Sequence, residues 1–546
     1  MRAIVAVVSA CAVLSGCASL PPAGPPAIDA ARLNQHVSVL ASDEFEGRGP
    51  TTPGEEKTVA YLAEQFRRLG LEGAGPGGSF VQEVPLYRFE RTGAFNASFN
   101  GRSWSRPLRR DAEVIVGTQR PLPRISVERA PVVFVGYGVK AAERNWDDFK
   151  GADLKGKLLL MLVNDPDFEV PAGHPTAGRF DGKAMTYYGR WTYKFEEAAR
   201  QGAAGVLVIH ETAGAGYGWS TLEGSAPTPQ FDIVRPDPAA ERAAVQGWVQ
   251  RLVVEEMLRR AGLNFEQLKA AAQRQDFRPV EVPGATFSAD FGVKSERVMS
   301  RNVLARVRGS SRPNETVLYG AHWDAFGRST PDATGDDIYN GAVDNASALG
   351  ALLELARVFA QGPRPQRSVM FASWAAEEKG LLGAEHYAAN PTAPLETTVA
   401  NLNMDSLLPG PPEPEIVVIG FGKGELEDRL GQLAAAQGRR LIPDPAPQAG
   451  AFYRSDHFSL ARMGVPVLFP SAGFTGASAA SRDYVANRYH KPSDEWDPSW
   501  DMSGAAQDVE LLHVLGRELA NGRQWPGWKP GAEFGAARTA SAAARR

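Results

Sequence analysis

The chain has 546 residues, of which 43% are hydrophobic and 22% are charged, and its formal net charge is −4. This is an ordinary globular composition in a chain long enough for several domains, and it excludes disorder over most of the length. No basic block is large enough to neutralise many phosphates, so the charge pattern argues against a nucleic-acid-binding protein.

The N-terminal segment indicates an exported protein. Arg2 is followed by an apolar run from Ala3 to Leu14, which is too short to span a bilayer and is typical of a secretory signal. The sequence Leu-Ser-Gly-Cys comes next and resembles the lipobox of bacterial lipoproteins. This resemblance implies a signal peptide over residues 1–17, cleavage before Cys17 and attachment of lipid to that cysteine.

The residues around Cys17 also bear on location. In the lipoproteins that the motif resembles, an aspartate after the cysteine retains the product in the inner membrane, whereas Ala18 and Ser19 stand here. We therefore expect attachment to the outer membrane, facing the periplasm. The alternative is a plain secretory signal cleaved nearby, and both interpretations place the protein outside the cytoplasm. The other cysteine, Cys11, lies inside the signal, so no disulfide is expected in the mature chain.

A proline-rich tether over residues 18–27 precedes the first part of the main domain, which we expect over residues 28–128. Helix-period apolar residues between Asp29 and Gly70, interrupted by the turn-rich GRGPTTPGE, predict two helices joined by a loop. Short alternating runs in residues 80–128 predict strands at the edge of a sheet.

Residues 129–285 form a second compositional unit. Its apolar runs and spacings predict strands at 131–138 and 156–163, a helix at 193–201, a strand at 205–210 and helical structure at 240–275. This order resembles the protease-associated domain that is inserted into several exported peptidases. The resemblance implies a β-rich insertion that carries no catalytic groups and covers the mouth of an active site.

From residue 286 to 525 the pattern becomes strand and helix in alternation. Short apolar runs predict strands at Val303–Val307, Thr316–Gly320, Ser368–Ala372 and Ile416–Gly420, with helices at Ala346–Ala360 and Glu425–Gln437. This alternation predicts the α/β class, as a three-layer sandwich around a mostly parallel sheet. Residues 526–546 lack apolar periodicity, and we expect a disordered tail there.

The main domain contains five candidate metal ligands and one further carboxylate, which are His322, Asp344, the pair Glu377–Glu378, Asp405 and His490. Two imidazoles and three carboxylates form the ligand set that two divalent cations sharing a bridging oxygen require. His322 follows one predicted strand, Glu377–Glu378 follow another and Asp405 ends a third, and ligands gather at the carboxyl ends of strands in such sheets. The sequence therefore predicts a two-metal site for metal-assisted hydrolysis.

Each ligand, taken singly, has a structural alternative. The alternatives are a satisfied loop histidine at His322, an N-cap at Asp344, a helix start at Glu377–Glu378, a turn at Asp405 and a capping residue at His490. Asp324, two residues after His322, could orient that imidazole through its carboxylate. The fixed order of all the ligands along one expected sheet edge favours the metal site over these separate roles.

Several segments around these residues resemble the two-zinc bacterial leucyl aminopeptidase family, which also contains relatives of glutamate carboxypeptidase and glutaminyl cyclase. The segments are AHWDAFG, GDDIYNGAVDNASALGALLELAR, FASWAAEEKGLLGAEHYA, NLNMDSL, YRSDHFSLARMGVPV and RYHKPSDEWD. The resemblance extends over residues 30–525 and includes the insertion. It implies a sandwich of the zinc-peptidase type that binds two Zn²⁺ ions.

The same resemblance implies a role for each ligand. Asp344 would bridge the two zinc ions, with His322 and Asp405 completing one site and Glu378 and His490 completing the other. Glu377 would be the free carboxylate, which accepts a proton from the attacking water and later delivers it to the leaving amine.

Other residues near these motifs are candidates for supporting roles. Tyr489 matches the tyrosine that stabilises the oxyanion in several relatives, with a core tyrosine as the alternative. Arg454 is a candidate for holding the substrate backbone. Asp456 could support the site or could be purely structural.

These inferences predict an exported zinc-dependent exopeptidase with peptides as substrates, and an aminopeptidase is the first interpretation. An export anchor combined with a protease-associated cover fits the scavenging of peptides. The alternatives are a carboxypeptidase or dipeptidase of the same family, a glutaminyl cyclase, and a non-catalytic receptor-like protein, against which the intact ligand set argues. The sequence leaves the preferred peptide end, the metal loaded in the cell and the oligomeric state open.

Overall fold

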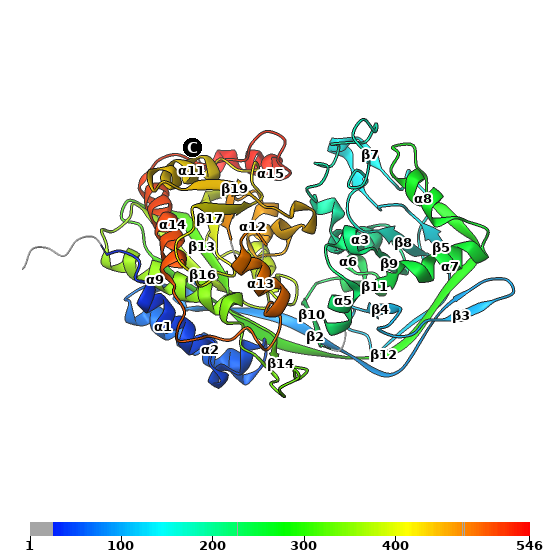
Figure 1. The fold of residues 1–546 in the computed structure, drawn as a ribbon, viewed down its shortest axis with the longest axis horizontal. Helices are drawn as coiled ribbons and strands as arrows, with labels where there is room; N and C mark the ends of the chain where they lie inside the picture. Colours follow the sequence, from blue (N-terminus) through cyan, green and yellow to red (C-terminus); the bar gives the residue numbers. More distant parts are fainter. Residues whose placement is uncertain (1–25, 226–227, 472, 474–475, 546) are drawn as a thin grey trace, which may run out of the picture.

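The computed structural model describes residues 26–225, 228–471, 473 and 476–545. They form two lobes side by side (Figure 1), a main lobe of residues 26–80 and 301–545 and a second lobe of residues 101–285, and the segments 81–100 and 286–300 connect the two. The expected signal peptide, Cys17 and the tether up to residue 25 lie outside the described residues. Within the described ranges, no helix has the length and apolar character needed to span a membrane.

The main lobe is built on a mostly parallel β-sheet. Its strands, in spatial order, are β19 (Arg440–Pro443), β18 (Glu415–Ile419), β20 (Val467–Pro470), β17 (Thr398–Asn403), β13 (Arg312–His322), β16 (Arg367–Trp374) and the end of β12 (Val280–Val307). Only β18–β20 and β16–β12 pair in antiparallel fashion among these neighbours. Each strand predicted between residues 303 and 420 is present.

Helices cover both faces of this sheet, which confirms the predicted α/β sandwich. One layer consists of α1 (Ala30–Leu40), α2 (Pro53–Arg68), α9 (Ser347–Gln361), α11 (Leu426–Ala436) and α14 (Ser503–Asn521), and the other contains α10 (Leu382–Ala389) and α12 (His457–Arg462). Alternate residues of β13 serve the two layers, since Val317 and Tyr319 lie in the first core and Leu318 in the second. Because both faces are covered, β16 is buried along its whole length.

Local signals set the start of the first two helices. The carboxylate of Asp29 accepts hydrogen bonds from two N–H groups in the first turn of α1. The hydroxyl of Thr52 caps α2, whose first residue is Pro53. These are the two helices that the sequence predicts between Asp29 and Gly70.

The second lobe has its own core, and its strands continue the main sheet through β12. In spatial order they are β5 (Arg124–Phe134), β8 (Leu158–Leu162), β9 (Gly205–His210), β11 (Val245–Gln250) and β4 (Val114–Gly117), accompanied by α3 (Trp191–Arg200), α7 (Arg251–Arg260) and α8 (Phe265–Ala272). The strands β8 and β9 and the helix α3 lie where the sequence predicts them, whereas β5 begins at Arg124 and ends at Phe134, so it overlaps only the first half of the strand predicted at 131–138.

Two features of the second lobe differ from expectation. Residues 245–250 form a strand, β11, which pairs in parallel with β9, although their apolar spacing suggested a helix. In addition, β4 pairs with β11, and Phe99 and Val116 lie in the same core as β5. The second lobe thus includes part of the segment 28–128 that we expected in the main domain.

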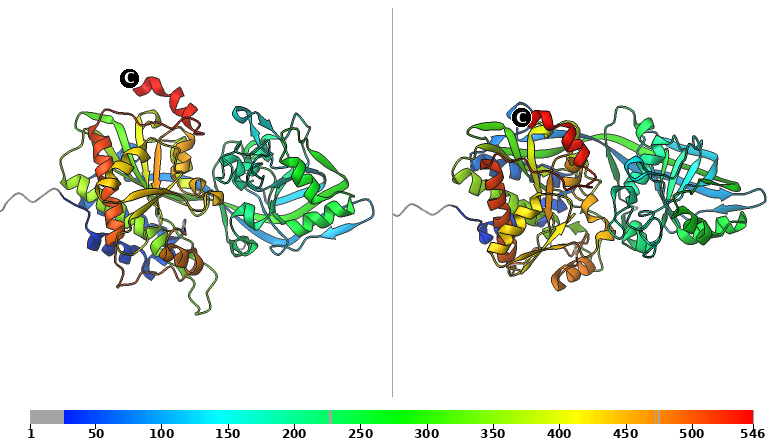
Figure 2. Two further views of the ribbon diagram at one scale, coloured as in Figure 1. Left: turned by 45° about the horizontal axis from the view of Figure 1, so that its top comes forward. Right: turned by 90° about the horizontal axis from the view of Figure 1, so that it is seen from above.

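The sequence does not reveal the boundary between the two lobes, because strands rather than a flexible linker join them. β2 (Val81–Asn100) runs antiparallel to β12, from the pair Val81–Val303 to the pair Asn100–Thr286, with one irregularity between Phe291 and Gly292. Both strands pass from the main lobe into the second lobe (Figure 1), and the other views show the lobes joined in the same way (Figure 2).

The C-terminal segment is packed against the main lobe, which corrects the disordered tail expected from residue 526. Trp528 and Phe534 are buried, with ring centroids 5.1 Å apart, and α15 (Gly535–Ala540) follows them. The guanidinium of Arg538 donates to the carbonyl oxygen of Thr398 at 3.0 Å. Single aromatic anchors separated by polar and small residues create no apolar period, so the sequence pattern does not reveal this packing.

Candidate metal centre

Three of the predicted ligand positions lie at one edge of the main sheet. His322 is the last residue of β13, the pair Glu377–Glu378 follows β16, and Asp405 follows β17. These three strands are neighbours and run parallel, so their carboxyl ends meet at the same edge. The sheet therefore brings together residues that are up to 83 positions apart.

The other two ligands come from loops. Asp344 lies in the turn before α9, and His490 follows α13 (Ala479–Asn487). The carboxylate of Asp494 fixes the first of these turns, because it accepts hydrogen bonds from the main-chain N–H groups of Val343 and Asp344, both at 3.0 Å. The hydroxyl of Tyr484 donates to the same carboxylate at 3.1 Å.

The structure brings the five ligands together as two groups that share Asp344. The first group contains His322, Asp344 and Asp405, and the second contains Asp344, Glu378 and His490; within each group the ligand atoms lie within 4.8 Å of one another. The two oxygens of the shared carboxylate face different groups, since Oδ1 lies 3.2 Å from His322 Nε2 and Oδ2 lies 3.4 Å from His490 Nε2. One carboxylate in this position can bridge two cations.

The charges at this site are unbalanced. Burial raises the pKa of Glu377 and of Glu378 well above the usual value, since neither carboxylate has a nearby cation strong enough to offset it. Burial lowers the pKa of His322, but Glu377, Asp344 and Asp405 outweigh it and hold that pKa well above its usual value. Four carboxylates meet two imidazoles, so the cluster needs additional positive charge.

Divalent cations fit this donor set. His490 Nε2 and Glu378 Oε1 are buried and have no hydrogen-bond partner, which is costly unless they bind something else. Imidazole nitrogen together with carboxylate oxygen is a common donor set for Zn²⁺. A small pocket with a cavity volume of about 10 Å³ lies beside Asp344, Glu378 and His490 and is also lined by Phe326 and Tyr339. That volume is enough for about one water molecule beside the ligands of the His490 group.

Asp324 supports the site differently from the expectation. The ring nitrogen Nδ1 of His322 hydrogen-bonds to the main-chain oxygen of Asp324 at 3.0 Å, whereas the Asp324 carboxylate is 3.8 Å away. That carboxylate accepts instead from the main-chain N–H groups of Glu377 and Glu378, at 2.9 and 3.2 Å. Asp324 thus orients His322 through its backbone and the glutamate pair through its side chain.

The remaining candidates lie around the same centre. Glu377 Oε2 is 4.0 Å from His322 Nε2 and belongs to neither ligand group. Tyr489 stacks on His490 with ring centroids 3.7 Å apart, and Arg454 Nη2 donates to its hydroxyl at 3.2 Å. Asp456 is buried without a hydrogen-bond partner for its carboxylate, and burial raises its pKa well above the usual value.

Two residues that hold the ligands in place, Asp494 and Arg48, could not be recognised from a sequence motif. Asp494 lies in the RYHKPSDEWD motif but has no pattern that links it to Asp344. Arg48 is fully buried and donates at 2.6–2.9 Å to four main-chain oxygens, those of Leu40, Trp323, Asn340 and Gly341. It ties the end of β13 to the loop before Asp344, and burial lowers its pKa to about 10.

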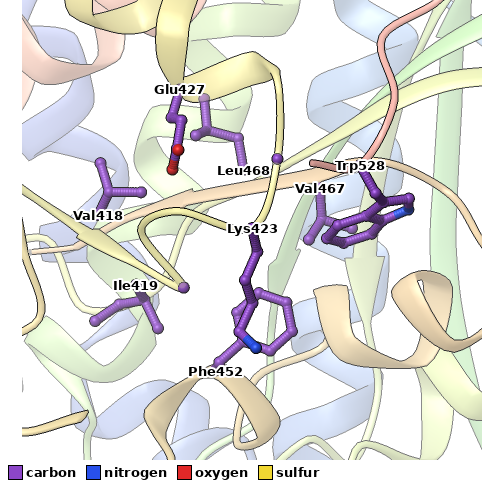
Figure 3. Close-up of a pocket in the computed structure, with 10 residues that line it drawn as sticks. Val418, Ile419, Lys423, Glu427, Phe452, Val467, Leu468 and Trp528 are labelled. Carbon is purple, nitrogen blue, oxygen red and sulfur yellow. The ribbon is translucent and has the colours of Figure 1, made fainter. Parts of the chain in front are cut away.

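A second pocket in the main lobe is separate from this site. It has a cavity volume of about 10 Å³ and lies between β18, β20 and the C-terminal segment (Figure 3). Val418, Ile419, Lys423, Phe452 and Trp528 are among its lining residues, and no ligand of the metal centre lines it. Glu427 is the single carboxylate among its described lining residues and none of them is a histidine, so it offers no donor set for a metal.

Comparisons with known proteins agree with this geometry. Residues 302–514 match the model of Peptidase family M28. The mouse protein "Aminopeptidase NAALADL1" is 36% identical over 135 residues, which are 22% of this chain and 16% of that protein. A "Probable zinc metalloprotease" of Pyrenophora teres f. teres is 38% identical over 103 residues, 19% of this chain and 22% of that protein. The matched part thus spans less than a quarter of the length of these relatives.

A solved structure extends the likeness to the fold of the whole chain. The aminopeptidase from Aneurinibacillus sp. strain AM-1 superposes with a TM-score of 0.52 over 90% of this chain and 94% of that protein, at 18% sequence identity. Coverage of this extent includes the second lobe. The part of the chain that contains the metal centre is therefore similar to Peptidase family M28, and the chain as a whole has the fold of a bacterial aminopeptidase.

Proposed function

We propose that the protein is an exported exopeptidase that uses two zinc ions and acts as an aminopeptidase. One observation carries the proposal, namely the pair of ligand groups that share Asp344 within the segment matching Peptidase family M28. Both groups have three protein ligands, which leaves coordination positions for water and substrate. A non-catalytic receptor on a peptidase scaffold has no need to keep both groups complete.

The residues around the ligands then have distinct tasks. When bound, zinc supplies Lewis-acid polarisation of the peptide carbonyl and lowers the pKa of water. Glu377 lies beside both groups without joining either, so it can hold the proton taken from the attacking water and pass it to the leaving amine. The Tyr489 hydroxyl, held by Arg454, can donate to the oxygen on which negative charge develops.

The second lobe serves in this proposal as a cover of the protease-associated kind. It contacts the main lobe close to the site, where Met185 N donates to Pro447 O at 3.1 Å and Tyr187 N donates to Glu533 Oε1 at 3.1 Å. A cover at this position would restrict the length and width of peptides that reach the ligands. Truncation is a poor test of this idea, since the two lobes share strands.

Export and anchoring form a further part of the proposal, motivated by the lipobox-like Leu-Ser-Gly-Cys sequence. The lipid would attach to Cys17 and hold the enzyme at the outer membrane, facing the periplasm. Growth with labelled palmitate tests this directly. The wild-type chain should take up label and sediment with membranes, whereas Cys17→Ser should do neither; equal labelling of both would refute the anchor.

The function is tested by zinc content and by a panel of blocked and unblocked peptides. We expect two zinc ions per chain and cleavage only of peptides with a free N-terminus. Glu377→Gln should keep both ions and lose about 10²- to 10⁴-fold in kcat, because it removes the proton acceptor but no ligand. The exposed Glu396→Gln is the matched control and should behave as wild type.

The other outcomes separate the alternatives. Cleavage of peptides with a blocked N-terminus and a free C-terminus would indicate a carboxypeptidase. Loss of ammonia from N-terminal glutamine without peptide cleavage would indicate a glutaminyl cyclase. A protein that binds no zinc and cleaves none of the peptides would refute the proposal that it is an enzyme.

A further inference from the structure

A carboxylate in the C-terminal segment connects the two lobes. The side chain of Glu533 is 11% exposed, and its Oε1 accepts from the main-chain N–H of Tyr187 in the second lobe at 3.1 Å. Its Oε2 accepts from the hydroxyl of Tyr453 in the main lobe at 2.6 Å and lies 3.2 Å from Lys423 Nζ. The two oxygens of one carboxylate therefore bind different lobes.

The residues on either side of Glu533 fix it to the main lobe. The indole nitrogen of Trp528 donates to the carbonyl oxygen of Gly464 at 3.1 Å. The ring of Phe534 stacks on that of Phe452, with centroids 5.9 Å apart. Both aromatic side chains of the segment are buried. Glu533 is thus held between two aromatic anchors and presents its carboxylate to the second lobe from a fixed position.

The side chain of Tyr187 enters the main lobe at the same place. Its ring centroid lies 4.9 Å from that of Phe458 and 6.0 Å from that of Tyr453, and it packs against a core cluster of the main lobe. Its hydroxyl donates to Glu196 of its own lobe at 2.5 Å, and Arg462 of the main lobe lies 3.4 Å from the same carboxylate. An inserted ring and two charged groups therefore hold the lobes together at this point.

This contact is close to the metal centre. Tyr453 directly precedes Arg454, whose Nη2 donates to the Tyr489 hydroxyl at 3.2 Å. The Tyr489 ring in turn stacks on His490. Three residues thus separate Glu533 from a metal ligand. An extended peptide advances about 3.3–3.6 Å per residue, so a substrate bound at the ligands reaches the contact between the lobes after a few residues.

The contact lies on the side of the molecule away from the strands that join the lobes. In Figure 1 the paired strands β2 and β12 cross between the lobes at the bottom, whereas α15, which directly follows Phe534, lies at the top. The paired strands keep the lobes attached and bend most easily at the irregularity between Phe291 and Gly292. A contact on the other side resists this bending, so its loss would let the lobes separate.

We propose that Glu533 latches the second lobe onto the main lobe and thereby restricts the metal centre to short peptides. The latch consists of the bonds that Glu533 makes to Tyr187 and Tyr453. While it is closed, the far end of a long peptide meets the second lobe. Glu533 is thus a specificity-determining residue, and it lies outside residues 302–514, the part that matches the family model. This inference rests on the proposed peptidase function and names its substrate class, short peptides.

Two peptides that differ only in length test the specificity. The wild-type protein should cleave Leu-Gly-Gly with a higher kcat/KM than leucine followed by nine glycines. Glu533→Ala should raise the kcat/KM of the long peptide relative to the short one by about tenfold, because bonds to a charged group are lost. Glu533→Gln should give an intermediate ratio, since its amide oxygen can still accept from Tyr187. An unchanged ratio in Glu533→Ala would overturn the proposal.

Asp428→Asn is the matched control. Asp428 is exposed and also pairs with the C-terminal segment, 2.8 Å from Lys529 Nζ, but this ion pair lies within the main lobe. The variant should keep the wild-type ratio, and all three variants should keep the wild-type zinc content. An equal rise in Asp428→Asn and Glu533→Ala would refute the role of Glu533, because loosening of the C-terminal segment alone would then account for the change.

Hydrogen exchange tests the latch without any measurement of activity. Since the Tyr187 N–H donates to Glu533 Oε1, Glu533→Ala should speed exchange of this amide about tenfold or more and leave β8 of the second lobe unchanged. If the wild-type protein cleaves no peptide, the proposed function fails, but faster exchange at Tyr187 would still support the latch. Unchanged exchange at Tyr187 would refute the latch whether or not the protein is a peptidase.

Discussion

Each lobe buries a group of charged side chains, and the two groups differ in how many hydrogen-bond partners their charged atoms have. In the second lobe, Lys194 lies between Asp148 and Asp165, and all three are fully buried. Lys194 Nζ donates to Asn164 O at 3.1 Å, Asp148 accepts from Val139 N and Trp146 Nε1, and Asp165 accepts from Thr186. Burial raises the pKa of each aspartate and lowers that of the lysine, but every charge has partners.

The group in the main lobe has more negative charge and fewer partners. Glu378 and His490 each have a buried atom without a hydrogen bond, and no lysine or arginine forms an ion pair with the described ligands. A satisfied buried cluster can serve stability, whereas an unsatisfied one is retained for something that binds. The comparison therefore distinguishes a buried group whose own hydrogen bonds satisfy it from one that needs a bound cation.

The largest expected effect comes from removing the shared ligand. Asp344→Asn should lower zinc content from two ions to one or none and reduce kcat/KM by at least about 10³-fold, because both ligand groups lose a charged member. Metal analysis and peptide hydrolysis measure this. Asp483→Asn, exposed on α13, is the control and should keep both ions and full activity. Loss of a single ion with most activity retained would contradict the bridging role.

The next effect is on stability in the other lobe. Lys194→Met should lower the free energy of unfolding by about 1–3 kcal/mol, because it leaves the buried Asn164 oxygen without its donor and removes the cation near two buried aspartates. Urea denaturation measures the change, and the exposed Lys155→Met should stay within about 0.5 kcal/mol of wild type. Zinc content should be unaffected. If Lys194→Met also lost zinc, the distinction between the two groups would fail.

The smallest effect is a dependence of zinc affinity on pH. In the metal-free protein, neighbouring carboxylates hold the pKa of His322 above its unfolded value, so this group stabilises the fold below about pH 6.5 and loses that contribution as pH rises through the higher folded value. Zinc needs the neutral ring, so its affinity should rise about tenfold per pH unit for each proton displaced.

Melting temperatures with zinc and with a chelator, at pH 6, 7 and 8, measure both sides of this linkage. The increase caused by zinc should be greatest at pH 8. An increase that is constant across the three values would show that zinc does not compete with a proton on His322.

Much of the fold and most of the metal centre could be predicted from the sequence. The strands of the main lobe are short apolar runs, and His322 and Glu377–Glu378 follow two of them, so a parallel sheet places them together. Arg48 could not be assigned to the site, because its acceptors include main-chain oxygens 275 to 293 residues away that no local pattern encodes.

The paired strands β2 and β12 control how far the two lobes can move relative to each other. A single-chain linker lets two bodies swivel about a few bonds, but here any rotation of the second lobe must bend or twist a two-stranded ladder whose hydrogen bonds resist it. The ladder is therefore stiff along most of its length, and it bends most easily at the irregularity between Phe291 and Gly292. The two strands therefore fix the spacing of the lobes at the contact between Met185 and Pro447.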